Sequence, residues 1–367
     1  MATTYTKKPA QVIFGAGDLG NNTNKGYDTD SSVSHFLEIC RSYYTSTCTK
    51  PHFDTGRAYP AANPGASETW LGRMSVGSWP ADIDTKVWSQ SPDAHRPAAI
   101  AKSISESLTA LGVDKVHTMY LHFPCRETPF SEVCGAMNAA FRQGKFDRWG
   151  LSNYTPADIE EMQSICHEMG YEPPRVYEGQ YNAVARLGEE KLLPVLRKYD
   201  MAYVAYSPSA AGLFSGQVTA DSVHKPTGRW SKSQPGGAIY ADMYLKPSLL
   251  ACSERVQDAA KRLGIPRGGH EVALRWVIHH SCLDGARGDG IIVGGSTLEQ
   301  ARQNVEICKQ GPLPQELVDL MEQVWAVARP IAPFAYPEWT KEEIEKMAEN
   351  LYAVGQETAP LPRATVA

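Results

Sequence analysis

Long apolar runs are scarce in this chain of 367 residues, of which 42% are hydrophobic and 21% charged. No stretch approaches the roughly 20 apolar residues that a membrane-spanning helix needs. Residues 1–10 also lack the apolar centre of a secretory signal peptide. We therefore expect no membrane partner and a cytoplasmic location.

Paired cysteines and basic tracts are missing as well. The eight cysteines are scattered without a Cys-x-x-Cys pair, which argues against a zinc site or a dithiol redox motif. The formal net charge is -5 and the longest basic tract is Lys7-Lys8, so nothing indicates a nucleic-acid partner. We expect no bound metal, and the sequence leaves homo-oligomerisation open.

What the chain does contain is a regular alternation of short apolar runs and helical patterns. The apolar runs predict strands at residues 11–14, 52–55, 83–87, 116–122, 146–150, 175–181, 201–206 and 290–294. Helical patterns lie at residues 30–40, 67–74, 97–111, 131–142, from 155 onward, and at 189–198, 249–263, 271–280 and 297–307. A long polar excursion covers residues 212–247.

This order of elements is typical of an α/β fold in which a parallel sheet closes on itself. It predicts a (β/α)8 TIM barrel formed by residues 1–330. Residues 331–367 are rich in proline around one helical run at 340–351, so we expect a C-terminal extension that packs on the barrel.

An open, doubly wound sheet is the alternative fold. Gly15, Gly17 and Gly20 have the Gly-x-Gly-x-x-Gly spacing of a dinucleotide-binding turn. The residues that follow, Asn21-Asn-Thr-Asn24, do not open a helix, so the spacing does not support that fold.

Polar residues able to do chemistry end three successive predicted strands. Asp54 and, five residues on, Tyr59 follow the second strand, Lys86 lies at the end of the third, and His122 ends the fourth. Because parallel strands of a barrel end on one rim, we expect these four side chains to converge. A cation near a phenol would make the phenol a usable proton donor. Taken singly, each residue could instead be a barrel-mouth ion pair, a loop aromatic or a core histidine.

At these positions the chain resembles the aldo-keto reductases over residues 10–330. The resemblance is carried by six motifs in the family's order: residues 53–59 (FDTGRAY), Thr85-Lys86, residues 120–124 (YLHFP), residues 150–154 (GLSNY), residues 205–208 (AYSP) and residues 294–304 (GGSTLEQARQN). Residues 67–73, 177–183 and 228–230 are most similar to the aflatoxin-aldehyde reductase branch.

The resemblance implies that a nicotinamide dinucleotide gives a hydride to an aldehyde or ketone at the barrel mouth. Tyr59 would donate the proton, Lys86 would bias the phenol toward that role, and Asp54 would hold Lys86. His122 would direct the carbonyl oxygen toward Tyr59. The expected cofactor is NADP(H), and the expected partner is a small carbonyl compound.

The resemblance also implies a set of cofactor contacts. Ser152 and Asn153 would hold the carboxamide, and Tyr206 would stack on the nicotinamide ring. Residues 207–216 would wrap the pyrophosphate through Ser207, Pro208, Gly212, Leu213 and Gly216. The adenosine phosphate would meet Gly294, Ser296, Gln300 and Asn304, with Arg229 as a further contact.

Several positions depart from the family pattern, and two of them bear on cofactor binding. Glu178 stands where the family usually has glutamine, so that a carboxylate there accepts a hydrogen bond from the carboxamide but cannot donate one. Gln217 stands where the related branch tends to have a phosphate-facing lysine. Arg229, Lys225 or Arg302 would then have to hold a 2′-phosphate.

The substrate side of the site is expected to be aromatic. Trp88 and Trp230 are candidate pocket walls beside His122, with Tyr27, Tyr336 and Trp339 as weaker candidates. This composition favours a hydrophobic or aromatic carbonyl of specialised metabolism. The alternative is a regulatory subunit that senses the cofactor on the same barrel with little turnover. A metal-dependent hydrolase is disfavoured, because His279-His280 lacks the spaced ligands that such sites need.

Overall fold

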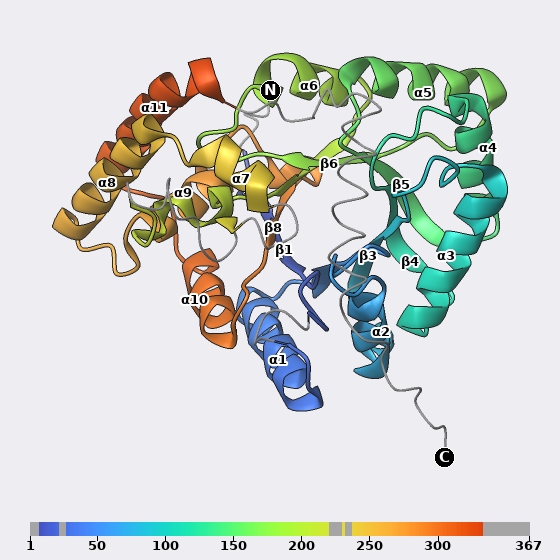
Figure 1. Cartoon of the computed structure of the whole chain (residues 1–367), viewed down its shortest axis with the longest axis horizontal. Helices are drawn as coiled ribbons and strands as arrows, with labels where there is room; N and C mark the ends of the chain where they lie inside the picture. Colours follow the sequence, from blue (N-terminus) through green and yellow to red (C-terminus); the bar gives the residue numbers. More distant parts are fainter. Residues whose placement is uncertain (1–6, 22–26, 220–229, 232–236, 333–367) are drawn as a thin grey trace, which may run out of the picture.

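The computed structural model describes residues 7–21, 27–219, 230–231 and 237–332 of the chain. Its centre is a closed barrel of parallel strands, in which neighbours follow the chain order and β8 pairs with β1 (Figure 1). The strands are β1 (Gln11–Gly15), β2 (His52–Asp54), β3 (Asp82–Val87), β4 (Val116–Leu121), β5 (Phe146–Ser152), β6 (Val176–Gln180), β7 (Ala202–Tyr206) and β8 (Gly290–Val293). The predicted (β/α)8 barrel is therefore confirmed.

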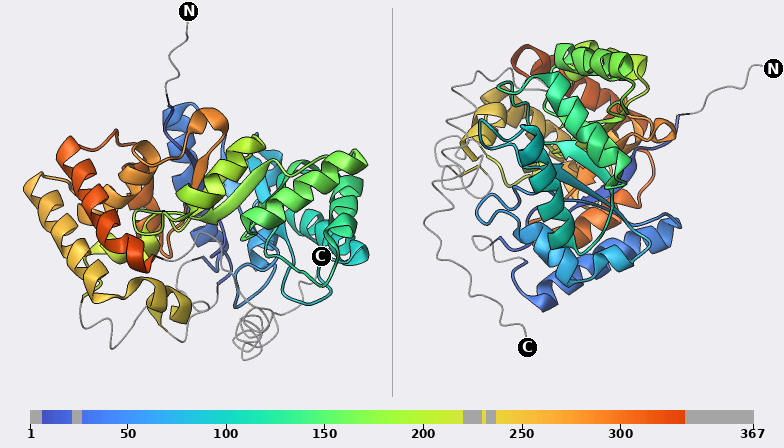
Figure 2. Two further views of the ribbon diagram at one scale, coloured as in Figure 1. Left: turned by 90° about the horizontal axis from the view of Figure 1, so that it is seen from above. Right: turned by 90° about the vertical axis from the view of Figure 1, so that its right-hand side faces the viewer.

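Helices cover the outside of the barrel (Figures 1 and 2). They are α1 (Asp30–Thr47), α2 (Ala66–Arg73), α3 (Pro97–Leu111), α4 (Phe130–Arg142), α5 (Pro156–Met169), α6 (Gly188–Lys198), α7 (Gly237–Tyr244), α8 (Pro247–Arg262), α9 (Gly268–His279), α10 (Leu298–Cys308) and α11 (Gln315–Ala328). Helix α8 packs against both α9 and α11. Within the described ranges, none of the helices combines the length and apolarity that crossing a membrane requires.

Local sequence signals set the ends of several helices. The Thr155 hydroxyl accepts from Asp158 N at 3.2 Å, and the Asp158 carboxylate accepts from Thr155 N at 2.9 Å, which together form a capping box at the start of α5. Helix α3 ends at Gly112, whose φ of 66° lies in the left-handed region that glycine adopts without strain. Both boundaries were predicted from the sequence.

The interior of the barrel has an apolar half and a polar half. Ile13, Tyr120, Val176, Ala202 and Val204 form a buried cluster, with Ile292 packed against it. The polar half is supplied by β2 and β3, whose inward-facing positions carry carboxylates and a lysine. Active sites of this type of barrel lie at the carboxyl ends of the strands, where Lys86 and Asp54 are placed.

Two helices go beyond those predicted from the sequence. Helix α7 lies inside the expected polar excursion, and α11 follows the expected last barrel helix. Helix α11 buries Leu317, Met321 and Val324, one apolar stripe of an amphipathic helix. The C-terminal extension, including the helical run at 340–351, lies outside the described residues, so its packing on the barrel stays a prediction.

Candidate active site

The side chain of Lys86 is fully buried near the carboxyl end of β3. Its Nζ lies 2.5 Å from Asp54 Oδ2, 2.8 Å from Thr55 O and 3.2 Å from Glu178 Oε2. The same Nζ lies 5.2 Å from the centroid of the Tyr59 ring. A single cation thus joins residues from β2, β3, β6 and the loop after β2.

The register of β2 against β3 accounts for the contact between Asp54 and Lys86. Asp54 pairs with Asp84, so Lys86 lies two residues further along β3 and faces the same side of the sheet. The loop after β2 is held against β3 by its backbone, since Thr55 N donates to Asp84 O and Arg57 N donates to Lys86 O. These bonds fix the start of the loop that carries Tyr59.

Tyr59 and His122 contact each other next to Lys86. Tyr59 Oη lies 3.0 Å from His122 Nε2, and the two rings are nearly perpendicular with centroids 5.2 Å apart. The His122 ring stacks on Phe123 at 4.4 Å. The four residues that the sequence predicted to converge do lie together in the fold.

Burial and charge set the protonation states of these groups. Burial opposes the charge on Lys86, but the attraction of Asp54 and Glu178 outweighs it and raises the Lys86 pKa. Burial and the nearby Lys86 cation hold the pKa of His122 well below its usual range, so its imidazole is neutral. Burial raises the pKa of Tyr59 even though Lys86 acts to lower it. The site at neutral pH therefore combines a charged lysine, a neutral histidine and a protonated phenol.

The expected carboxamide residues lie beside this group. Asn153 follows β5 with a φ of 66°, a left-handed conformation that asparagine tolerates better than most residues. Its Nδ2 donates to His122 O at 3.0 Å and to Ser152 Oγ at 2.9 Å. Its Oδ1 accepts from the hydroxyl of Tyr206, at the end of β7, at 2.9 Å. Hydrogen bonds thus link the ends of β4, β5 and β7.

Glu178 completes the ring of side chains from β6. It pairs in register with Ser152 on β5 and with Val204 on β7. It is 3% exposed, and its Oε2 has no hydrogen-bond partner among the described residues, although Lys86 lies within ion-pair distance. The sequence pointed to Glu178 as a carboxamide contact and missed its pairing with Lys86.

Comparison with known proteins places this geometry in a family. The family model described as "Aldo/keto reductase family" matches residues 11–326. The chain belongs to the aldo-keto reductase family. Its members are oxidoreductases that act on small carbonyl compounds and generally use a nicotinamide dinucleotide, so this chain is an oxidoreductase of that kind.

Individual relatives agree with this family. Aldo-keto reductase family 7 member A3 of Homo sapiens is 34% identical over 87% of this chain and 94% of its own length. Aflatoxin B1 aldehyde reductase member 2 of Mus musculus is 33% identical over 87% of this chain and 85% of its own length. Oxidoreductase sirO of Leptosphaeria maculans is 31% identical over 88% of this chain and 95% of its own length. The predicted resemblance to the aflatoxin-aldehyde reductase branch is confirmed.

The loop after β7 has an unusual backbone conformation. Ser207, Ala210 and Ala211 have φ of 53°, 51° and 53°, and Gly212 follows at 88°. Non-glycine residues rarely adopt this region, and such strain collects at binding sites. A Cβ on Gly212 would meet no atom of the described residues within 4 Å.

Three other residues expected to contact the pyrophosphate also have a place in the packing of this loop. Pro208 and Leu213 are buried, and Leu213 O accepts from Ser253 Oγ at 2.8 Å. Gly216, with a φ of 77°, ends the short helix Ala210–Ser215. Pro208 and Leu213 thus pack the loop against the rest of the fold.

The loop after β8 is tied together by its own side chains. Ser296 precedes α10, which starts at Leu298, and Ser296 N donates to Gln300 Oε1 at 2.9 Å. Asn304 is buried, and its Nδ2 donates to Gly294 O at 2.7 Å. Its Oδ1 lies 2.8 Å from His270 Nε2, so the amide of Asn304 is already engaged within the fold.

The remaining predicted contacts are spread over the molecule. Trp230 is 8% exposed and packs edge-on against Tyr244 of α7, with ring centroids 5.9 Å apart. Trp88 is half-buried after β3, whereas Tyr27 is buried and donates to Gly295 O at 2.8 Å. Arg302 is exposed and pairs with Glu299 at 3.1 Å. The other candidates lie outside the described residues: Lys225, Arg229, Tyr336 and Trp339.

Below Lys86, the barrel holds a second polar cluster that sequence reasoning missed. Asp84 is 1% exposed, with Oδ2 2.9 Å from His52 Nε2 and Oδ1 2.9 Å from His117 Nδ1. Burial opposes a charge on Asp84, but the two histidines hold its pKa well below its usual range. Although the set resembles three metal ligands, each of these atoms already has a partner within the cluster. We interpret it as a support beneath Lys86.

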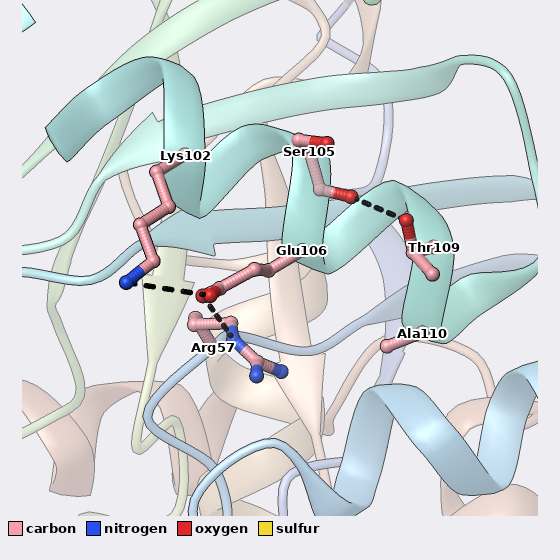
Figure 3. Close-up of a pocket in the computed structure, with 6 residues that line it drawn as sticks. All are labelled: Arg57, Lys102, Ser105, Glu106, Thr109 and Ala110. Carbon is pink, nitrogen blue, oxygen red and sulfur yellow. Dashed lines mark hydrogen bonds and ion pairs between the residues drawn. The ribbon is translucent and has the colours of Figure 1, made fainter. Parts of the chain in front are cut away.

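A depression on the outer face of α3 lies away from this chemistry. Figure 3 shows that Arg57 and Lys102 both point toward Glu106, at 3.6 and 3.9 Å. Arg57 also binds the buried Glu68 at 2.9 Å. None of the four converging residues lines this depression, so we do not assign the reaction to it.

Proposed function

We propose that the chain reduces an aldehyde or ketone to an alcohol with NADPH, and that Tyr59 donates the proton. The observation that carries this proposal is the meeting of Tyr59 Oη and His122 Nε2 at 3.0 Å above the buried Lys86. A carbonyl oxygen that approaches one of these groups also approaches the other. The bound nicotinamide would supply the hydride.

The protein's own groups then handle the proton. We assign the imidazole proton to Nε2 of His122, which lets it donate to Tyr59 Oη and leaves the phenol O–H free for the carbonyl. As the carbonyl oxygen gains charge, Tyr59 would pass its proton to it. The remaining phenolate would be stabilised by the nearby Lys86 cation and by His122. Asp54, 2.5 Å from Lys86 Nζ, keeps that cation in place.

Residues around these four would hold the cofactor. Asn153 and Ser152 offer amide and hydroxyl groups to the carboxamide, and Tyr206 presents a ring whose hydroxyl is anchored on Asn153. The loop from Ser207 to Gly216 is the proposed pyrophosphate site, and the loop that follows Gly294 is the proposed site of the adenosine phosphate. NADPH is preferred over NADH on the resemblance to the family.

We further propose a hydrophobic or aromatic substrate. The half-buried Tyr240 supports it, since its ring stacks on the buried Tyr244 and its Oη lies 3.4 Å from Ser207 Oγ beside the proposed cofactor loop. One relative, from Mus musculus, is named as an aflatoxin B1 aldehyde reductase, which agrees with an aldehyde as the substrate.

The test combines binding with turnover. NADPH is titrated into the protein while intrinsic tryptophan fluorescence is followed, and NADPH consumption is then measured with a panel of aromatic aldehydes and diketones. We expect a saturable fluorescence change and consumption that depends on the carbonyl compound. Binding without consumption by any member of the panel would favour the regulatory alternative. A protein that does not bind NADPH at all would contradict both readings.

A further inference from the structure

Glu178 gives the buried cation of this site a second carboxylate. Lys86 Nζ lies 2.5 Å from Asp54 Oδ2 and 3.2 Å from Glu178 Oε2, and all three residues are at most 5% exposed. Two ionised carboxylates around one ammonium would leave a net negative charge in the barrel, which a low-dielectric interior disfavours. One proton bound to the carboxylate pair removes that excess.

The proton belongs on Glu178 rather than on Asp54. Asp54 makes the shorter contact with Lys86, whereas Glu178 Oε2 lies further away and without a well-aligned hydrogen bond. Burial, with repulsion by Asp54, raises the pKa of Glu178 to about 8 despite the attraction of Lys86. Glu178 therefore changes its charge in the mildly alkaline range.

Several other titratable groups surround Glu178, and burial raises the pKa of one of them, Asp54, against the attraction of Lys86. They come from the neighbouring strands and loop: Asp54 on β2, Tyr59 after it, Asp84 and Lys86 on β3, and Tyr120 on β4. Burial raises the pKa of both phenols, and the attraction of Asp54 and Glu178 raises that of Lys86 against its burial. The carboxylate of Asp84 stays ionised because its histidine partners lower its pKa against the effect of burial. Because Asp54 makes the closer contact with Lys86, we assign the change of charge near pH 8 to Glu178.

We propose that Glu178 selects between the reduced and the oxidised nicotinamide cofactor according to pH. This inference rests on the proposed function, because it needs a nicotinamide beside Glu178. It is supported by the register, which pairs Glu178 with Ser152 next to Asn153. As a neutral acid, Glu178 offers one donor and one acceptor, the same pattern as an amide side chain. As a carboxylate, it places a negative charge near the ring and favours the positively charged oxidised form.

Thermodynamic linkage turns this into two measurable effects. Raising pH through the titration of Glu178 should weaken NADPH binding relative to NADP⁺ binding. By reciprocity, binding of NADP⁺ near pH 8 should release protons from the enzyme, and binding of NADPH should release fewer or take protons up. NADPH and NADP⁺ carry the same phosphates. The ratio of their dissociation constants is therefore unaffected by the titration of those phosphates.

The experiment measures the dissociation constants of NADPH and NADP⁺ from pH 6.5 to 9.5 by tryptophan fluorescence. The wild type is compared with Glu178→Gln, which keeps the shape of the side chain but cannot ionise. Glu132→Gln, an exposed position on α4, is the matched control for removal of a carboxylate. Calorimetry in buffers of different ionisation enthalpy counts the protons released on binding.

In the wild type and in Glu132→Gln, we expect the ratio Kd(NADPH)/Kd(NADP⁺) to rise at least about tenfold across this range, because one charge pair at an effective dielectric near 20 is worth about tenfold even at a separation of roughly 12 Å and more at shorter distances. In Glu178→Gln the ratio should stay flat.

A flat ratio in the wild type, or an equal rise in Glu178→Gln, would overturn the inference while leaving the proposed function standing. If Glu178→Gln does not fold, proton counts decide, since equal counts for both cofactors in the wild type overturn the inference. Failure of both cofactors to bind would instead reject the proposed function.

Discussion

At the scale of single residues, the site is organised by one buried cation. Lys86 neutralises Asp54, lies near Glu178 and approaches the ring of Tyr59, so each of these groups depends on the charge of the same ammonium. Removing a partner from such a buried arrangement costs more than the arrangement itself contributes, because an uncompensated charge is left behind. The electrostatics of the site should therefore be visible in stability as well as in turnover.

Stability should depend on pH through Glu178. An unfolded glutamate loses its proton near its usual pKa of 4.5, whereas folded Glu178 keeps its proton up to about pH 8. Between these values the folded state binds one more proton, so the stabilisation is complete below the lower pKa and is lost as pH rises through the higher one. We expect the free energy of unfolding of the wild type to fall by more than about 1 kcal/mol relative to Glu178→Gln from pH 5 to pH 9.

Urea denaturation at several pH values checks this expectation, with each variant compared at the same ionic strength. Parallel pH profiles for wild type and Glu178→Gln would show that Glu178 does not hold an extra proton in the folded state.

Much of the arrangement of individual site residues could be predicted from the sequence. Asp54, Tyr59, Lys86 and His122 could be predicted to converge because each ends a strand or follows one, and parallel strands in a barrel share a rim. The contact of Glu178 with Lys86 could not be predicted in the same way. It joins β6 to β3 across the barrel, and strand order alone gives no distance between strands that are not neighbours.

At the scale of elements, the buried Tyr244 is a main anchor of α7 on the barrel, next to Tyr240, whose Oη lies 3.4 Å from Ser207 Oγ. The hydroxyl of Tyr244 accepts hydrogen bonds from Gln180 Nε2 and from Asn182 Nδ2, the latter at 2.9 Å. Asn182 Nδ2 also donates to Ser207 O at 3.0 Å, so the anchor reaches the proposed cofactor loop. The position of α7 and the shape of that loop are therefore coupled.

Replacing Tyr244 by phenylalanine should loosen this anchor. The change removes an acceptor that the amides of Gln180 and Asn182 share, although Asn182 Nδ2 keeps its bond to Ser207 O. Leaving a buried donor without its partner costs about 1–3 kcal/mol. We expect a loss of that size in the free energy of unfolding, together with weaker NADPH binding. Tyr43→Phe on α1 is the control for loss of a phenol hydroxyl elsewhere. Unchanged stability and unchanged NADPH affinity in Tyr244→Phe would argue against the anchor.

Helices α11 and α7 differ in how clearly the sequence indicates them. The apolar spacing of Leu317, Met321 and Val324 after Pro314 was a readable signal for α11. Helix α7 is different, since it is only eight residues long and fully buries only Gly237 and Tyr244, with Tyr240, Ala241 and Met243 partly buried against the core. Tertiary contacts, chiefly those of Tyr244, hold it in place.

At the scale of the whole molecule, a buried ion-pair network lies at the end of the barrel opposite to the candidate active site. The amino-terminal end is closed by Asp289, which is fully buried just before β8. It binds both terminal nitrogens of Arg197 on α6 and accepts from Tyr203 N and Asp284 N, each at 2.8 Å. This network joins β7, β8 and α6 without touching the residues around Lys86.

Removing the charge of Asp289 should separate stability from activity. Asp289→Asn leaves Arg197 without its carboxylate, and breaking a buried ion pair in this way costs about 3–5 kcal/mol. We expect a loss of that size in urea denaturation, with kcat and KM unchanged at a temperature where the variant is folded. Asp147→Asn is the matched control, because its pair with Lys115 is half exposed and should be worth less than about 1 kcal/mol. A large fall in kcat without a loss of stability would contradict this division.

The central claim is that Tyr59 protonates a carbonyl beside a bound nicotinamide. The most direct test measures NADPH consumption with an accepted aldehyde, and NADPH affinity by fluorescence, in wild type and Tyr59→Phe. The account predicts that kcat falls about 10²- to 10⁴-fold, the usual contribution of a positioned general acid, while NADPH affinity stays nearly unchanged. Equal rates for Tyr59→Phe and the wild type would contradict it.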